Sequence, residues 1–571
     1  MNSSTIHALL ISDFNITPLA NFLNNSNDPP SLITKAAPYG QIQQILLDHT
    51  SSFLSEKSDL VVVWTQPEKV IESFHLLADF RSVSLDRLLL EVDEYSELLM
   101  KIKHRVKWVF VPTWTFPLAQ TGSILTEMND GNGITNTLFQ MNLRLARNFS
   151  NIANFYLLNT NRWVEFVGRN AYNQKLWYMA KIPYSSEVFK HASKDMKTAL
   201  RGILGWGKKL IILDLDDTLW GGTVGDLGWQ NIQLGGHDPM GEAFVDFQKA
   251  LKSLKNRGIL LAVISKNQES IALEAICSHS EMVLRTEDFA GWKINWHDKA
   301  ENILDLVSDL NIGLESVVFI DDNAFERARV REALPDVLVP EWPESPMLYK
   351  SALLSLPYFD SPSITAEDLS RAEMYAAERR RKQAQKSFVS LEAWLKGLNL
   401  TLEVEELSER NLIRTTQLLN KTNQMNLTTR RLAEKELLEW SRQPNCTVWT
   451  CRVTDKFGDL GLTGIVSLCI DGAIGTIVDF VLSCRVMGRR IEETLLYIII
   501  NYARSLNLHT IHAKYRPTAK NKPCLEFWKR SGFKYSETED LFTWDLRYQY
   551  LRPDHVLIKM ENQTTAMPLC N

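Results

Sequence analysis

Two aspartates separated by one residue follow a short apolar segment near the middle of the chain. The stretch Lys208–Gly222 reads KKLIILDLDDTLWGG and places Asp214 and Asp216 directly after its aliphatic residues. A short apolar run closed by polar residues and glycines is typical of a buried parallel strand, and open α/β sheets bind ligands at the carboxyl ends of such strands. One carboxylate could attack an electrophile while the other handles a proton, and together they could hold Mg²⁺. A solvated acidic turn is the alternative interpretation of this segment by itself.

Three further polar groups stand at predicted strand or helix ends. Ser265 follows an apolar run, and its hydroxyl could hold a phosphoryl oxygen. Lys299 precedes a predicted helix and could neutralise charge on a phosphoryl group. Asp321 and Asp322 follow another apolar run and would complete a Mg²⁺ site. Each feature alone is common, but their order along the chain favours a site for phosphoryl chemistry.

The elements that must position these residues alternate between strand and helix patterns, which predicts a multidomain α/β protein. Residues 205–360 form the segment that carries the acidic motifs, and we expect a parallel sheet there. Its predicted strands are Leu210–Asp214, Leu260–Ser265 and Val317–Asp321. Its predicted helices are Glu242–Arg257, Glu269–Cys277 and Ala300–Leu310.

The first segment, residues 1–204, is predicted to be a doubly wound α/β domain. Its predicted strands are His7–Ser12, Asp59–Thr65 and Lys107–Pro112. Ser12-Asp13 stands where a strand would lead into a helix, so Ser12 could be a hydrolase nucleophile. No matching Asp-x-x-His pattern is found near Trp177–Lys181. A non-catalytic docking domain, a degenerate version of the SGNH hydrolase fold, is therefore the favoured interpretation.

The remaining chain is predicted to hold a linker helix at 361–398, an α+β domain at 399–552 and a tail at 553–571. The linker is rich in helix formers and in charges of both signs, which is typical of a solvated helix. The predicted elements of the α+β domain are strands Thr447–Val453, Thr463–Ile470 and Ala473–Leu482 and a helix over Glu492–Ser505.

The bulk composition limits the class of protein. A chain of 571 residues is too long for one core, which predicts about three domains. The formal net charge of −5 and the absence of a strongly basic segment argue against nucleic acid as a partner. With neither a signal-peptide pattern nor an apolar run that could span a bilayer, we expect a cytoplasmic protein without a membrane partner. Its seven cysteines show no paired spacing and are expected to be reduced.

The order of the acidic, serine, lysine and second acidic motifs resembles that of the haloacid dehalogenase-like (HAD) superfamily. The resemblance implies a sheet with a minimal cap, Asp214 as the nucleophile that forms an aspartyl-phosphate, and Asp216 as general acid/base. It also implies that Ser265 and Lys299 bind the phosphoryl group. The implied magnesium site comprises Asp214, the Asp216 carbonyl, Asp322 and the supporting Asp321.

Several longer stretches resemble the FkbH-like subgroup of this superfamily. They include LDLDDTLWGG, ISKN and FIDDNAFER in the central segment, and KTNQMNLTTRR and SCRVMGRRIE in the C-terminal one. The C-terminal segment is similar to GNAT acyltransferases. In those proteins, a loop before a helix presents backbone N–H groups to the phosphates of coenzyme A. The resemblance implies that Arg485, Gly488 and Arg489 bind the phosphopantetheine arm of a carrier protein. The last position of this loop, usually small, is Arg490 here.

Cys484 lies immediately before this loop. A thiol beside Arg485 and near a helix start is expected to be more reactive as a thiolate, so Cys484 is the candidate for holding an acyl group as a thioester. Buried packing is the alternative role of this cysteine. Many relatives carry a cysteine where this chain has Ile264, and Asp217 stands where they often have Asn.

FkbH-like proteins are associated with loading a glyceryl unit from 1,3-bisphosphoglycerate onto an acyl carrier protein in polyketide or related biosynthesis. The resemblance therefore implies a Mg²⁺-dependent phosphatase and glyceryl transferase, with the order of its two reactions open. Three alternatives remain at this stage. They are a HAD phosphatase acting on another metabolite, a GNAT-type enzyme that uses acyl-CoA, and a non-catalytic scaffold.

Overall fold

The computed structural model describes residues 5–47, 58–117, 120–121, 124–152, 154–362, 381, 384 and 388–560. They form two parallel sheets and one mixed sheet, which confirms the predicted multidomain α/β class. The chain divides into two compact units, Met1–Arg201 with Ala433–Lys435 and Gly202–Leu432 with Glu436–Asn571. Within the described ranges, no helix has both the length and the apolar character that a membrane span requires.

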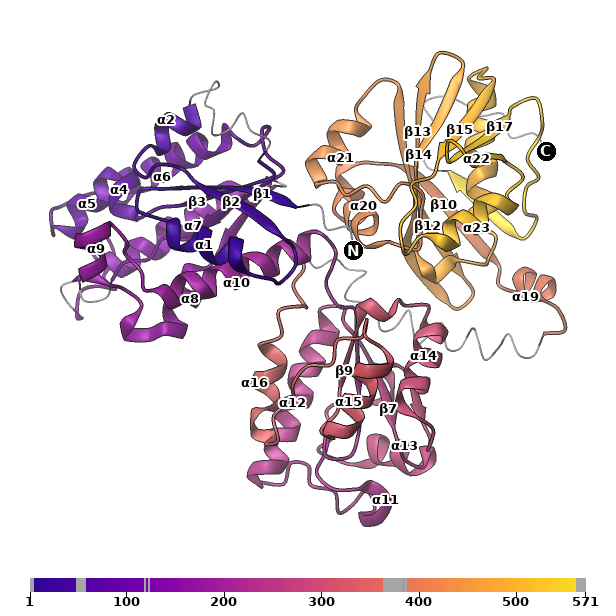
Figure 1. The fold of residues 1–571 in the computed structure, drawn as a ribbon, viewed down its shortest axis with the longest axis horizontal. Helices are drawn as coiled ribbons and strands as arrows, with labels where there is room; N and C mark the ends of the chain where they lie inside the picture. The colour runs from indigo at the N-terminus through magenta and orange to yellow at the C-terminus, as the bar shows by residue number, and fades with distance from the viewer. Residues whose placement is uncertain are drawn as a thin grey trace. The chain divides into compact units, whose positions relative to one another are not determined.

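The first sheet is five-stranded and parallel, with strand order β2-β1-β3-β4-β5. Its strands are β1 (Ile6–Ser12), β2 (Leu32–Ala36), β3 (Leu60–Trp64), β4 (Trp108–Pro112) and β5 (Phe155–Leu158). Its helices are α1 (Thr17–Asn25), α2 (Ile42–Leu47), α4 (Pro67–Val70), α5 (Glu72–Ala78), α6 (Leu85–Met100), α7 (Ile134–Phe149), α8 (Thr160–Val167), α9 (Gln174–Ala180) and α10 (Ser186–Ile203). Helices lie on both faces of this sheet (Figure 1), as doubly wound domains require.

Ser12 ends β1, but it is not presented as a nucleophile. Its side chain is buried, and its hydroxyl oxygen accepts a hydrogen bond from the Phe14 N–H at 3.1 Å. This local bond is an ordinary serine turn.

The second sheet is four-stranded and parallel, with strand order β8-β7-β6-β9. Its strands are β6 (Leu210–Leu213), β7 (Leu260–Ser265), β8 (Phe289–Ile294) and β9 (Val317–Ile320). Its helices are α11 (Val224–Leu227), α12 (Pro239–Asn256), α13 (Glu269–Ser278), α14 (Lys299–Leu310), α15 (Ala324–Ala333) and α16 (Tyr349–Leu354). The three predicted strands are confirmed, and the short α11 is the one helix between β6 and α12, as a minimal cap requires.

Alternating residues of β6 explain why this sheet is covered on both faces. Ile211 and Leu213 pack in one buried cluster with residues of α12 and α13. Leu210 and Ile212 pack in a second cluster with residues of α14. Because side chains alternate between the faces of a strand, a run that is apolar at every position must lie inside a sandwich of helices. The polar residues after β6 therefore emerge at the sheet edge.

The third sheet is mixed and nine-stranded, with order β16-β17-β15-β14-β13-β12-β10-β18 and with β11 on β14. Its strands are β10 (Leu400–Glu406), β11 (Met425–Asn426), β12 (Cys446–Asp455), β13 (Gly458–Asp471), β14 (Ile474–Leu482), β15 (Thr510–Lys514), β16 (Lys534–Ser536), β17 (Leu541–Asp545) and β18 (Val556–Met560). Its helices are α19 (Leu391–Gly397), α20 (Glu409–Lys421), α21 (Glu434–Ser441), α22 (Ile491–Ser505) and α23 (Lys522–Arg530).

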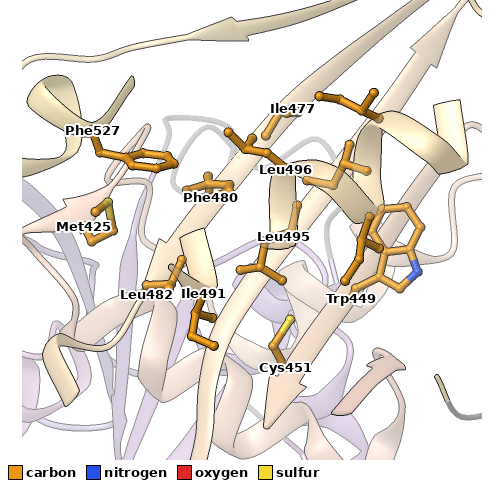
Figure 2. Packing of buried hydrophobic residues seen from close by; sticks show 14 of the residues in the cluster. Met425, Trp449, Cys451, Ile477, Phe480, Leu482, Ile491, Leu495, Leu496 and Phe527 are labelled. Carbon is orange, nitrogen blue, oxygen red and sulfur yellow. The ribbon is translucent and has the colours of Figure 1, made fainter. Parts of the chain in front are cut away.

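Helix α22 is fixed to this sheet by an apolar stripe. Its residues Ile491, Leu495 and Leu496 lie among the strand residues Phe480 and Leu482 in one buried cluster (Figure 2). The spacing of the three helix residues is that of one helical face, so the helix has a single orientation on the sheet. This packing determines where the loop before α22 begins and ends.

Two boundaries differ from the sequence-based expectation. Strand β18 lies in the predicted tail, 553–571, yet it pairs in parallel with β10 and extends the sheet to Met560. The predicted linker helix, 361–398, is described only in part. Its last turns form α19, and residues 363–380, 382–383 and 385–387 lie outside the described residues.

The prediction that all seven cysteines are reduced is wrong for one pair. Cys446 and Cys469 are directly opposite each other on β12 and β13 and form a disulfide. Their separation of 23 residues is not a local motif, because the register of two paired strands brings them together. The free cysteines of the described residues are Cys277, Cys451, Cys484 and Cys524. Cys570 lies outside those residues.

Candidate phosphoryl-transfer site

The two acidic motifs converge because their strands are neighbours. Strands β6 and β9 are parallel and in register from Leu210 opposite Val317 to Leu213 opposite Ile320. The residues that follow them therefore leave the sheet at the same edge. Side-chain oxygens of Asp214, Asp321 and Asp322 all lie within 4.8 Å of one another. The predicted convergence of the acidic strand ends is thus seen in the structure.

Lys299 lies inside this carboxylate group. It is the first residue of α14, whose N-cap Asp298 accepts a hydrogen bond from the Ala300 N–H at 2.9 Å. The Lys299 ammonium lies 2.6 Å from Asp321 Oδ2 and 3.0 Å from Asp214 Oδ2, with a side chain only 4% exposed. Burial alone would lower the pKa of Lys299, but the two carboxylates raise it above its ordinary value. The lysine therefore stays charged at the site.

The carboxylates outnumber this cation. Burial raises the pKa of Asp321, and the charge of Asp214 adds to that effect while Lys299 opposes it. Burial and Asp214 likewise raise the pKa of Asp322, although the Thr218 hydroxyl donates a hydrogen bond to it at 3.1 Å. Two buried acids, Asp214 and Asp321, and the half-buried Asp322 surround one lysine and leave an excess of negative charge, which a divalent cation would neutralise.

One oxygen of the cluster is a natural metal ligand. Asp214 Oδ1 is buried and, among the described residues, receives no hydrogen bond from a donor. A buried carboxylate oxygen without a donor is costly unless a ligand satisfies it. The geometry and the all-oxygen chemistry of Asp214, Asp321 and Asp322 therefore fit Mg²⁺.

Asp216 is held separately from this cluster. Its carboxylate accepts hydrogen bonds from Trp220 Nε1 at 2.8 Å, the Val224 N–H at 3.0 Å and Asn267 Nδ2 at 2.8 Å. Burial raises its pKa, and these hydrogen bonds oppose that effect. The sequence predicts that Asp216 contacts magnesium through its main-chain carbonyl. Its carboxyl group, which the three hydrogen bonds orient, is then available for proton transfer.

Ser265 and Asn267 complete the sheet edge. Strand β7 lies next to β6, with Leu213 opposite Val263, so its last residue Ser265 is buried near the carboxyl end of β6. The role of Asn267 in orienting Asp216 was not predicted. Its position two residues after Ser265, at the same strand end, was the available signal.

The loop that carries the predicted acyl site lies after β14 in the third sheet. Cys484 is partly exposed and begins a three-residue 3-10 helix, η6 (Cys484–Val486), whereas α22 begins only at Ile491. Arg485 Nε donates a hydrogen bond to the Ser483 hydroxyl at 3.0 Å. Arg489 is buried, and its guanidinium lies 3.6 Å from Asp455.

A carboxylate already occupies part of this loop. The Gly488 N–H, predicted to face a phosphate, donates a hydrogen bond to Glu492 Oε1 at 3.0 Å. Glu492 is buried, and burial raises its pKa to about 7. Arg490, at the N-cap of α22, has a φ of 60°. An anion at Gly488 would compete with Glu492, which argues against tight binding of the coenzyme A pyrophosphate by this loop.

Comparison with known proteins gives one informative match. No protein-family model matches the chain, and no curated protein matches it. The solved N-terminal part of BF1531 from Bacteroides fragilis, which contains a phosphatase domain complexed with Mg, is 32% identical, with a TM-score of 0.56. The match covers 63% of this chain and 95% of the BF1531 chain.

Two acetyltransferases match a smaller part of the chain. The ribosomal-protein-S18-alanine N-acetyltransferase from Escherichia coli is 9% identical, with a TM-score of 0.20 over 25% of this chain and 94% of its own. An acetyltransferase of the GNAT family from Staphylococcus aureus is 11% identical, with a TM-score of 0.21 over 25% of this chain and 99% of its own. The BF1531 match is the one that decides the family, because it combines identity with nearly complete coverage of the solved chain. The chain therefore belongs to the HAD-like phosphatase-domain family that includes the N-terminal part of BF1531.

Proposed function

We propose that the protein is a Mg²⁺-dependent phosphatase and glyceryl transferase. It would load a glyceryl unit from 1,3-bisphosphoglycerate onto the phosphopantetheine thiol of an acyl carrier protein, as in polyketide assembly. The observation that carries the phosphatase half is the buried group of Asp214, Lys299, Asp321 and Asp322. The BF1531 phosphatase domain, complexed with Mg, supports the choice of metal. The carrier and the glyceryl donor come from the FkbH-like sequence motifs.

The phosphatase step follows from the roles of two aspartates. An Asp214 oxygen attacks the phosphorus of the C3 phosphate, and the bond from phosphorus to the C3 oxygen breaks. Asp216, whose pKa is raised by burial, protonates the departing oxygen and then takes a proton from the water that hydrolyses the aspartyl-phosphate. Lys299 stabilises the charge on the phosphoryl oxygens, and bound Mg²⁺ would add to this electrostatic stabilisation.

The acyl step uses a different bond of the donor. The C1 acyl phosphate is already activated, so a thiolate that attacks its carbonyl carbon expels phosphate and keeps the activation as a thioester. Cys484 is the best candidate in the C-terminal domain, because the other free cysteines of its described part, Cys451 and Cys524, are fully buried. Burial also raises the pKa of both of those thiols.

Phosphate release is the first test. Wild-type protein should release phosphate from phosphate esters only with Mg²⁺, and Asp214→Asn should abolish that release because it removes the nucleophile. Asp226→Asn is a matched control, since Asp226 is an exposed carboxylate of the same domain. Near-normal turnover by Asp214→Asn would contradict the assignment of the site.

Mass spectrometry of a carrier protein tests the transferase half. Protein mixed with 1,3-bisphosphoglycerate and a phosphopantetheinylated carrier should give a glyceryl-thioester mass shift. Cys484→Ser should remove or slow this shift, whereas Cys277→Ser, at an exposed free cysteine of the phosphatase domain, should not. Phosphate release without a mass shift on several carriers would indicate instead a HAD phosphatase with a docking C-terminal domain.

A further inference from the structure

A cavity of about 370 Å³ opens beside the acidic cluster. Asp322 belongs to both, so the cavity begins where a bound phosphoryl group would lie. Phe244 of α12 and Tyr349 of α16 form an apolar part of its wall, with ring centroids 6.1 Å apart in an edge-to-face contact. A phosphate ester bound at Asp214 needs room for the group attached to its phosphate, and this cavity supplies it.

The polar part of the cavity wall offers acceptors. Asp217 and Glu344 contribute carboxylates, and both residues are exposed to solvent. One N–H of the Gln233 amide donates to Asp238 at 2.6 Å, and the carbonyl oxygen of the same side chain can accept a hydrogen bond from a ligand. The Tyr349 hydroxyl donates its proton to the Asp217 carbonyl at 3.2 Å. The described residues that line the cavity include no lysine, arginine or histidine.

We propose that this cavity holds the leaving group of the phosphate ester and selects one that is uncharged and donates hydrogen bonds. The inference rests on the proposed phosphatase function and adds to it a substrate class. A hydroxyl can donate to the oxygens of Asp217, Gln233 and Glu344. A carboxylate in the same place meets no lysine, arginine or histidine among the described lining residues and lies near the like charges of Asp217 and Glu344, each of which should weaken binding by up to about tenfold.

Two simple phosphate esters test the inference in the full-length protein with Mg²⁺. Glycerol 3-phosphate and 3-phosphoglycerate differ in the group at C1, a neutral alcohol in one and a carboxylate in the other. We expect kcat/KM to be about tenfold or more higher for glycerol 3-phosphate. Glu344→Gln should reduce the ratio of kcat/KM for glycerol 3-phosphate to kcat/KM for 3-phosphoglycerate, and Glu344→Lys should reduce it further. The main change should be a higher kcat/KM for 3-phosphoglycerate.

One control variant and two contrary outcomes make this test decisive. Glu341→Gln removes a carboxylate three residues away that pairs with Arg331 outside the cavity, and it should leave the ratio unchanged. Equal kcat/KM for the two esters, or a ratio that neither Glu344 variant moves, would overturn the proposed selectivity while leaving the phosphatase intact. Failure to release phosphate from either ester would overturn both the selectivity and the proposed phosphatase function.

Discussion

Lys299 is the residue on which the electrostatics of the acidic cluster depend. Its ammonium bridges Asp214 and Asp321 at 3.0 and 2.6 Å in a nearly solvent-free environment. Breaking a buried ion pair by removing one partner is much more costly than losing a surface pair, because the remaining charge stays buried without compensation. The lysine therefore stabilises the metal-free fold.

Replacing Lys299 with methionine separates these two effects. We expect Lys299→Met to lower the stability of the metal-free protein by about 3–5 kcal/mol, because Asp214 and Asp321 would face each other without a cation. Mg²⁺ should restore part of this loss, because it supplies the missing positive charge. Thermal unfolding in EDTA and in Mg²⁺ measures both quantities.

Lys266→Met is the matched control for this substitution. Lys266 pairs with Glu326 on the surface, with 39% of its side chain exposed, and such pairs contribute about 0–1 kcal/mol. A Lys299→Met protein as stable in EDTA as the control would show that the cluster holds fewer charges than we infer.

The site residues that could be predicted are those that follow apolar runs. Asp214 and Asp321 come directly after strands whose pattern is visible in the sequence, Ser265 ends such a strand, and Lys299 begins a visible helix. Asn267 lies at the same strand end as Ser265, but no sequence pattern shows that its side chain donates a hydrogen bond to Asp216.

At the scale of elements, strand pairing decides which side chains meet. Strands β12 and β13 form an antiparallel hairpin whose register places Cys446 opposite Cys469. The apolar patterns predicted both strands but not their register, which contains two irregularities. An expectation based on cysteine spacing alone could not anticipate this disulfide, since the pairing depends on the positions of those irregularities.

Removal of this disulfide should destabilise the hairpin. A bridge that closes a loop of 23 residues contributes about 3 kcal/mol, mainly by restricting the unfolded chain. We expect the double substitution Cys446→Ser and Cys469→Ser to lower the melting temperature of the C-terminal domain, and a reducing agent to do the same to wild type. A reducing agent should have no further effect on the double variant. Equal melting of wild type and variant under oxidising conditions would contradict the contribution assigned to the bridge.

Strand length alone did not decide which strands were predicted. The four-residue strands β6 and β9 were found, whereas β5, β11 and the longer β8 and β10 were missed. Longer apolar runs such as β7 and β14 were found within two residues of their observed ends. The difference reflects how much of each strand's stability comes from neighbours in the sheet rather than from its own sequence.

At the scale of the whole molecule, each of the three sheets packs against its own apolar clusters. Local patterns predicted alternating strands and helices for the first two sheets and an α+β order for the third, in which β12, β13 and β14 follow one another without a helix. The return of β18 to β10 was not predicted, since it joins segments about 150 residues apart in a chain of 571. Contacts of this kind depend on the completed sheet, which offers a free edge, and not on the residues of the strand alone.

A buried acid in one domain can make the stability of that domain depend on pH. Asp13 follows β1 in the first domain, and its carboxylate accepts the Gln66 N–H at 2.8 Å while its other oxygen is buried. Burial raises the pKa of Asp13 to about 7 from an ordinary value of 3.8. In the C-terminal domain, burial likewise raises the pKa of Glu492 to about 7.

The direction in which the stability of the first domain changes with pH follows from the protons that the folded and unfolded chains bind. Between about pH 4 and pH 7 the folded protein holds a proton on Asp13 that the unfolded chain has lost, so stability falls as the pH rises through this range. A difference of about three pKa units corresponds to about 4 kcal/mol at most, and the loss is complete above pH 7. Asp13→Asn should reduce this dependence in the first domain, because an amide stays neutral and can still accept the Gln66 N–H. The part that remains comes from Glu68, whose pKa burial also raises.

Hydrogen exchange of β1 and β3 can follow the first domain by itself, since exchange reports local unfolding. After correction for the intrinsic rate, protection of these strands in wild type should decrease from pH 5 to pH 8, and it should decrease less in Asp13→Asn. The exposed Asp130 gives the control Asp130→Asn, which should behave as wild type. The same decrease in wild type and Asp13→Asn would show that Asp13 is ionised in the folded protein throughout this range, and the buried carboxyl would then need a cation that the described contacts do not supply.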